Sequence, residues 1–215
     1  MRKIASATVI ALAILSSCGG DDSSDSTTPS NNSAPITSEV ATDAPLEGTL
    51  ENYVGQDLSG GSYVDMDFKG TDMTEVNFSG ADLTNSYFGL TTMTTANLSS
   101  ANLTGAGFYA ADLTGADLTG ANLADANFSS AILTNANLAD AQGQGSNFRK
   151  AQLGDASLVG ANMTGANFAD AILTGADLTN VDFTDANLYY ADLTGANMTG
   201  AILTGANITG AIIPE

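Results

Sequence analysis

The sequence predicts an all-β solenoid with four-sided coils, and three observations support this prediction. One pattern of five residues runs from Gln56 to the end of the 215-residue chain without insertion or deletion. The central residue of each pentapeptide, from Leu58 to Ile213, is Leu, Phe, Met, Ile or Tyr in 31 of 32 cases. Six phenylalanines recur at every twentieth residue from Phe68 to Phe168, which indicates four pentapeptides per coil and about eight coils.

Residues 1–17 have the pattern of a secretory signal peptide. Two basic residues precede an apolar stretch, 4–15, that is too short to span a bilayer. The following Leu15-Ser16-Ser17-Cys18 resembles the lipobox of bacterial lipoproteins, in which the cysteine is acylated and becomes the first residue of the mature protein. The resemblance implies that Cys18 anchors the chain to a bacterial membrane outside the cytoplasm. An ordinary secretory signal with an incidental cysteine is the alternative.

The segment 18–45 is expected to be a disordered tether behind the lipidated cysteine. It consists almost entirely of small, polar and acidic residues, which bury too little apolar surface to offset the entropy of ordering. In residues 46–55, Leu46, Leu50 and Tyr53 recur at helical spacing. We therefore expect a short helical or irregular N-terminal cap there, followed by the solenoid at 56–215.

A period of five residues fits neither an α-helix nor a flat strand. On a helix, successive centres rotate by about 140°, and on a strand an odd period sends them to opposite faces. A coil that turns a corner once per pentapeptide instead directs every centre toward one axis. Alanine stands two residues before the centre in 23 of 32 repeats and is expected to be the small core residue.

The run resembles the pentapeptide repeat proteins. The resemblance covers about three quarters of the chain, as in the consecutive Ala-Asp-Leu-Thr-Gly units at 111–115 and 116–120. It implies a right-handed quadrilateral β-helix with the centre and the alanine position inside. It also implies an alternative function, because some acidic members are thought to imitate DNA and to bind a topoisomerase such as gyrase.

The composition excludes much common chemistry. The chain has no histidine, one cysteine, and 5 basic against 24 acidic residues. A histidine-based triad, a zinc cluster, an internal disulfide and phosphate-mediated nucleic-acid binding are therefore ruled out. We expect no enzyme, no cofactor and no metal site. A calcium column through Asp72, Asp112 and Asp192 is the weaker alternative.

One side of the solenoid differs from the others in composition. The twenty-residue spacing assigns the three basic residues of the mature chain, four tyrosines and a leucine to the side with the phenylalanines or to its following corner. These candidate interaction residues are Lys69, Tyr87, Leu90, Tyr109, Arg149, Lys150, Tyr189 and Tyr190. Tyrosine and arginine are typical of contact surfaces, so we expect this side to bind a protein or a glycan. Clustering by chance or for stability is the alternative.

Two further positions carry expectations. Gly143 replaces one inward side chain and is interpreted either as a defect filled by Met163 or as the mark of a bend. The last coil is rich in isoleucine, at Ile202, Ile208, Ile212 and Ile213, and is the expected interface of an end-to-end homodimer. Together these features predict a non-catalytic, lipid-anchored scaffold or binding module of the cell envelope.

Overall fold

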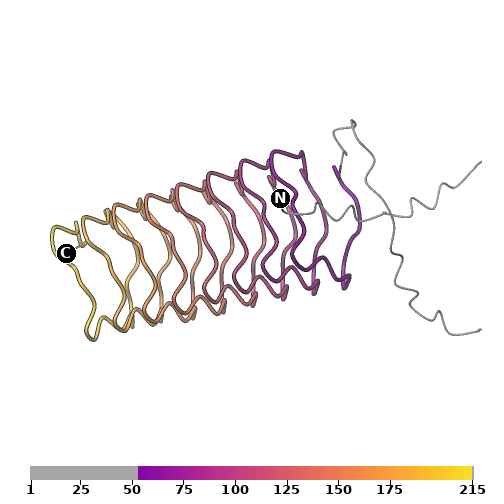
Figure 1. Ribbon diagram of the computed structural model, residues 1–215. Helices are drawn as coiled ribbons and strands as arrows, with labels where there is room; N and C mark the ends of the chain where they lie inside the picture. The colour runs from indigo at the N-terminus through magenta and orange to yellow at the C-terminus, as the bar shows by residue number, and fades with distance from the viewer. Residues whose placement is uncertain (1–52, 215) are drawn as a thin grey trace, which may run out of the picture.

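The computed structural model describes residues 53–214, which form a rod of stacked coils (Figure 1). Within this range the coils contain neither helices nor strands of several residues. Single-residue parallel bridges connect each coil to the next, from Asp57 with Asn77 to Asp192 with Ile212. No helix of the described residues is long and apolar enough to cross a membrane.

Every bridge joins residues twenty positions apart, which confirms four pentapeptides per coil. Two kinds of backbone hydrogen bond maintain this register. The N–H of a centre donates to the next coil, as from Leu98 to Asp117 at 2.7 Å, and the N–H of the preceding residue donates to the previous coil, as from Asn97 to Val76 at 2.9 Å. The backbone of a middle coil is thus bonded on both sides.

Each pentapeptide ends in a corner whose residue has a positive φ. Gly105 has φ 66°, and the next N–H, that of Ala106, donates to the carbonyl of the centre Leu103 at 2.9 Å. Glycine adopts this left-handed conformation freely, and Asn and Asp tolerate it better than other residues. The corner therefore explains the Gly, Asn and Asp at every fifth position.

The core lies inside the coils and consists of the two predicted positions. Centres such as Leu113 and the alanines two residues before them, such as Ala111, are completely buried. The rings of Phe88, Phe108, Phe128, Phe148 and Phe168 stack with centroids 4.7–4.8 Å apart and interplanar angles of 2–8°. This distance equals the expected spacing of the coils and confirms the phenylalanine column.

Where serine or threonine replaces the inward alanine, its hydroxyl bonds to the backbone. Thr91 Oγ1 donates to the carbonyl of Phe88 at 2.7 Å, and Ser146 Oγ donates to that of Gly143 at 2.6 Å. Gly143 itself creates no void, because a Cβ at this position would lie 2.5 Å from Met163 Sδ. The interpretation of Gly143 as a defect filled by Met163 is thus supported.

The coils begin earlier than the repeat count suggested. Tyr53, assigned to the cap from the sequence, is buried at a centre position, and its N–H donates to the carbonyl of Asp72 at 3.1 Å. Its ring packs edge-on against Phe68 at 5.6 Å. Residues 53–55 therefore form part of the first coil. The signal peptide, the tether and residues 46–52 of the expected cap lie outside the described residues.

Candidate functional site

The candidate site is the outer surface of what we call the phenylalanine side, residues 66–70 and the equivalent five residues of each later coil, ending at 206–210. All eight predicted interaction residues lie on this side. Lys69, Tyr109, Arg149 and Tyr189 directly follow a centre, and Leu90, Lys150 and Tyr190 occupy the corner. Tyr87 precedes its centre. The structure thus brings together the residues that the spacing placed together.

This side also differs in charge. It carries three basic and two acidic side chains between residues 53 and 214, a net charge of +1. The other three sides carry four, five and five acidic residues and no basic residue in the same range. The rod is therefore anionic on three sides and nearly neutral on the fourth.

The residues that follow the centres alternate in size along the phenylalanine side. From the first coil to the last, this row reads Lys69, Gly89, Tyr109, Ser129, Arg149, Ala169, Tyr189 and Thr209. The four long side chains are exposed, whereas Gly89 and Ala169 are buried and Ser129 is half-buried. On the other three sides the same row holds Thr, Ser, Val, Ala, Gly, Gln or Pro with no such alternation. Sequence analysis did not detect this pattern, although the spacing of forty residues contains it.

The corner of this side holds residues that the other corners lack. Leu90, Ala110, Lys150 and Tyr190 all have positive φ, between 53° and 62°. The left-handed conformation costs an L-residue with a Cβ about 1–2 kcal/mol. At the other three corners, every residue with positive φ is Gly, Asn, Asp, Ser, Thr or Glu. The two large apolar residues are also among the most exposed, at 55% for Leu90 and 58% for Tyr190.

The ring of Tyr87 covers two glycines. A Cβ at Gly107, in the next coil, would lie 2.7 Å from Tyr87 Cδ2, and one at Gly89 would collide with the phenol end of the ring. Tyr190 covers Gly210 in the same way, with Cε1 2.8 Å from a Cβ built there. Glycine at these positions thus makes room for outward-facing aromatic rings.

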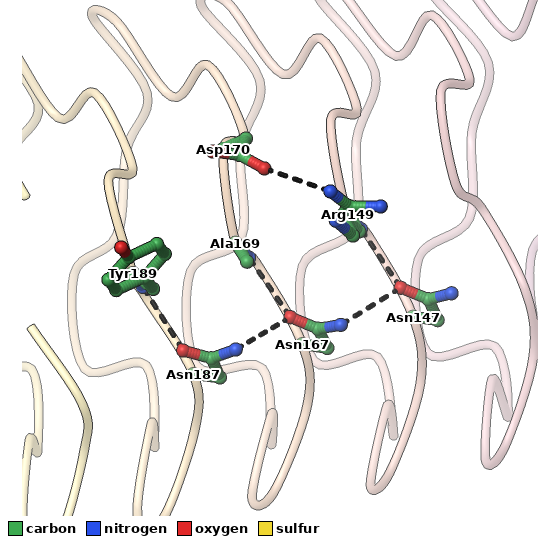
Figure 2. Close-up of polar contacts among 7 residues, drawn as sticks. All are labelled: Asn147, Arg149, Asn167, Ala169, Asp170, Asn187 and Tyr189. Atoms are coloured by element: carbon green, nitrogen blue, oxygen red, sulfur yellow. Dashed lines mark hydrogen bonds and ion pairs between the residues drawn. The ribbon is translucent and has the colours of Figure 1, made fainter.

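A ladder of asparagines connects the coils next to this row. Nδ2 of Asn147, Asn167, Asn187 and Asn207 each donates to Oδ1 of the asparagine one coil earlier, at 3.1–3.4 Å. Each Oδ1 also accepts the backbone N–H two residues later, as from Ala169 to Asn167 at 3.1 Å (Figure 2). Asparagine serves here because a single side chain must both donate and accept.

The ladder positions the backbone beneath the outward side chains. Asn147 Oδ1 accepts the N–H of Arg149, and Asn187 Oδ1 accepts that of Tyr189 (Figure 2). The Arg149 guanidinium reaches Asp170 with Nη2 3.4 Å from Oδ2. Both groups are more than one third exposed, so this ion pair orients the guanidinium more than it stabilises the fold.

Tyr189 and Tyr190 form an aromatic pair near the last coil. Their rings meet edge to face with centroids 4.4 Å apart. The neighbouring Tyr190 raises the pKa of Tyr189, with smaller contributions from burial, from their hydrogen bond and from Asp170. The Tyr189 phenol therefore remains neutral near pH 7.

Several aspartates that precede a centre on the other sides bond to the residue after that centre. Oδ1 of Asp82, Asp112, Asp177, Asp182 and Asp192 accepts both the N–H and the hydroxyl of the threonine two residues later. The Thr84 hydroxyl, and then its N–H, lower the pKa of Asp82. The threonine hydroxyl and N–H likewise lower the pKa of Asp177, Asp182 and Asp192. These aspartates are turn residues without the raised pKa of a general acid.

The calcium alternative is not supported by the arrangement of these aspartates. Asp72, Asp112 and Asp192 are two and four coils apart, which is about 10 Å or more at the spacing of parallel strands. Between residues 53 and 214 no three His, Cys, Asp or Glu side chains lie close enough to hold a metal ion.

The last coil exposes the predicted isoleucines. Ile202, Ile208, Ile212 and Ile213 are 39–56% exposed, and the inward Leu203 is only partly buried. From Thr194 to Pro214 the chain has no charged residue. This end of the described rod is therefore its most apolar region.

Comparison with known proteins identifies the fold. The family model for pentapeptide repeats matches eight copies, covering residues 57–89, 91–120, 121–160, 146–185 and 182–213. No curated protein matches the chain.

Several solved structures are similar. Trypsin-treated QnrB1, a plasmid-mediated fluoroquinolone resistance protein, is 22% identical with a TM-score of 0.53, over 70% of this chain and 72% of QnrB1. HetL, a pentapeptide repeat protein involved in heterocyst differentiation regulation in the cyanobacterium Nostoc, is 27% identical over 74% of this chain and 87% of its own, with a TM-score of 0.27. A pentapeptide repeat protein of the Arabidopsis thaliana thylakoid lumen is 34% identical over 62% and 68%, with a TM-score of 0.26. The register of twenty, the buried centre and alanine positions and the family match show that this chain belongs to the pentapeptide repeat family.

Proposed function

We propose that this protein is a non-catalytic, lipid-anchored binding module of a bacterial cell envelope whose contact surface is the phenylalanine side. The observation that carries the proposal is the corner of this side. Leu90, Lys150 and Tyr190 accept a left-handed backbone that glycine would adopt without strain. Strained residues persist where another requirement outweighs stability, and exposed Leu and Tyr at such sites favour a requirement for contact.

The distribution of charge also supports the phenylalanine side as the contact surface. Fourteen of the sixteen acidic residues in 53–214 lie on the other three sides, which repel most anionic surfaces. The phenylalanine side combines exposed tyrosines with Arg149 and Lys150, residue types enriched at interfaces or able to reach a partner's acceptors. A partner that carries negative charge therefore meets its lowest electrostatic barrier there.

The non-catalytic assignment is consistent with the family, whose members are generally non-catalytic. The chain also lacks histidine, the commonest general acid-base residue. The lipid anchor is supported by the lipobox-like sequence that ends at Cys18, which lies outside the described residues. These features favour a module that holds or recognises another molecule.

The test of the contact surface uses site-specific photo-crosslinking of the full chain in bacterial cells. A photoreactive phenylalanine analogue replaces Tyr109 or Tyr189, and a matched control carries it at Ala139, in the equivalent row of the opposite side. We expect adducts from positions 109 and 189 and none from 139. Equal adducts from 139, or none from 109 and 189, would overturn the proposed surface.

The same experiment addresses the alternative of a DNA mimic. A topoisomerase recognised through imitation of DNA would contact the acidic sides, so crosslinks from 139 to such an enzyme would favour this alternative. The likeness to QnrB1 shows the fold alone at 22% identity.

The anchor has its own test. The full chain is expected to incorporate labelled fatty acid and to fractionate with membranes, and Cys18→Ser is expected to abolish both. Unlabelled protein accumulating in the cytosol would contradict the anchor and leave the contact surface to be judged by crosslinking.

A further inference from the structure

We propose that the phenylalanine side binds an extended β-1,4-linked glycan that lies along the rod axis. The inference rests on the proposed function, because it specifies what that contact surface recognises. It starts from the row in which long and small residues alternate. Lys69, Tyr109, Arg149 and Tyr189 project from every second coil, with Gly89, Ser129 and Ala169 between them.

The spacing of this row is fixed by the fold. Stacked phenylalanine rings of adjacent coils are 4.7–4.8 Å apart. The long side chains therefore recur at twice the coil spacing, about 10 Å for parallel strands. A β-1,4-linked glycan rotates each sugar by a half turn relative to the previous one, so the same ring face recurs once per disaccharide. That disaccharide repeat is close to the length of two coils.

The chemistry of the row fits sugar rings. The Tyr87 ring covers Gly107 and Gly89 in the interval between Lys69 and Tyr109, and Tyr87 is partly exposed. Flat, outward aromatic faces pack against the axial C–H groups of β-linked pyranoses. Tyr109 and Tyr189 are 48% and 42% exposed and can provide further rings along the same line.

Polar groups for the sugar hydroxyls stand beside these rings. Lys69, Arg149 and Lys150 are exposed donors, and the Arg149 guanidinium is directed along the rod toward Asp170 (Figure 2). Each ladder asparagine uses one N–H of its amide toward the neighbouring coil, and the amide has two. A net charge of +1 on this side suits a neutral polymer, whereas the anionic sides offer no comparable rings.

A helical protein segment is the main competing occupant. Its heptad repeat is also about 10.5 Å long, but a helix is rounded and uses an apolar stripe wide enough to cover a groove. The phenylalanine side offers no such groove. It is one side of a β-helix, on which single long side chains project with small residues between them. The glycan is therefore the occupant that the row favours, and a protein occupant is an outcome of the test.

The experiment measures co-sedimentation of residues 19–215 with insoluble chitin and cellulose, together with calorimetry against chitohexaose. This form retains every residue of the coils, whose core and hydrogen-bond network lie within residues 53–214. We expect binding to at least one of these glycans. The variant with both Tyr109→Ser and Tyr189→Ser is expected to bind at least tenfold more weakly, and the control Val159→Ser on the opposite side to bind normally.

A second variant tests the spacing itself. Ser129→Tyr adds an aromatic ring at a small position and removes the alternation, while the backbone N–H of residue 129 still donates to Asn127. If the spacing of two coils matters, this variant binds at least tenfold more weakly. Unchanged or tighter binding of Ser129→Tyr would show that the tyrosines bind nonspecifically, whatever their spacing, and would overturn the inference.

The outcomes separate this inference from the proposed function. If none of the three glycans binds while positions 109 and 189 crosslink to a protein, the inference of glycan binding is wrong and the proposed contact surface is supported. If neither glycan binding nor crosslinking is seen, the glycan inference and the proposed contact surface are both wrong. Chitin or cellulose binding that survives the double tyrosine change would place the glycan elsewhere and contradict the inference.

Discussion

The ring of Tyr87 occupies the space that a side chain at Gly107 would need, with Cδ2 2.7 Å from a Cβ built there. Residue 107 precedes its centre, a position where this side has asparagine from Asn127 onward. The asparagine ladder therefore begins only after Gly107, and the absence of a side chain at Gly107 leaves room for an aromatic ring. Tyr87 and Gly107 therefore depend on each other, because the ring packs in the space that the glycine leaves.

Gly107→Asn is expected to displace the Tyr87 ring from the backbone and leave the coils intact. The new side chain restores the repeat and can bond to Asn127, so thermal stability should be equal or higher. Binding through the phenylalanine side should weaken. A crystal structure of the variant checks the ring position, and an undisturbed Tyr87 ring would contradict this account.

Asn167→Ala is expected to lower the free energy of unfolding by about 1–2 kcal/mol, because it removes side-chain bonds to Asn147, Asn187 and the N–H of Ala169. Denaturant titration measures the loss. Asn167→Asp keeps the acceptor for Ala169 but places a carboxylate against Asn147 Oδ1. It should also be destabilised, and stability equal to the wild type would show that the ladder contributes little.

Leu90→Asn is expected to stabilise the protein by about 1 kcal/mol, because asparagine tolerates the φ of 62° that strains leucine. The same change should weaken partner binding. Asp140→Asn, at a corner of the opposite side, is the control and should alter neither stability nor binding appreciably. If Leu90→Asn destabilises the protein, leucine serves the fold at this corner and the argument from strain fails.

Acid should destabilise the rod through its Asp-Thr pairs. The Thr84 hydroxyl and N–H hold the pKa of Asp82 below its ordinary value, so their stabilisation is complete above the unfolded-state pKa and is lost as pH falls through the folded pKa. Thr84→Val removes the hydroxyl and should reduce the loss of unfolding free energy between neutral and acidic pH. Comparing the two proteins cancels the general relief of charge repulsion, and identical pH profiles would refute the role of the pair.

Self-association is expected at the isoleucine-rich last coil. Ile208 and Ile212 are 43% and 56% exposed in the uncharged stretch 194–214, which is followed by Glu215, so two copies meet less repulsion there than along the acidic sides. Sedimentation velocity should show a dimer at high concentration, and Ile208→Lys with Ile212→Lys should restore the monomer. Ile172→Lys, at an equally exposed site in the middle of the rod, is the control. A wild-type monomer at high concentration would exclude this interface.

The sequence was sufficient for the architecture, because one period of five and one of twenty determine which residues face inward and which share a side. The grouping of Lys69 with Tyr189, 120 residues apart, followed from this arithmetic alone. Tyr53 was missed as a centre because Glu51 stands where the repeat usually has alanine, although Asn52 and Gly55 match the pattern. Its burial depends on the coil above it, whose Asp72 accepts its N–H.

The details of the site depended on geometry that the pattern does not encode. Asn147 and Asn167 bond across coils because their amides meet at the coil spacing, whereas Asp82 turns to its own Thr84. Asp82 also accepts the amide of Asn102 from the next coil, because one carboxylate can accept from both groups. The strain at Leu90 could be inferred only once its corner was known to be left-handed.

The register of twenty has a consequence for how such a protein can change in length. A duplication or deletion of twenty residues would lengthen or shorten the rod by one coil and return every later residue to its former side. An insertion of five residues would preserve the core but rotate everything after it by a quarter turn. The tyrosines before and after the insertion would then face in directions at right angles, so whole-coil changes alone keep the proposed contact surface continuous.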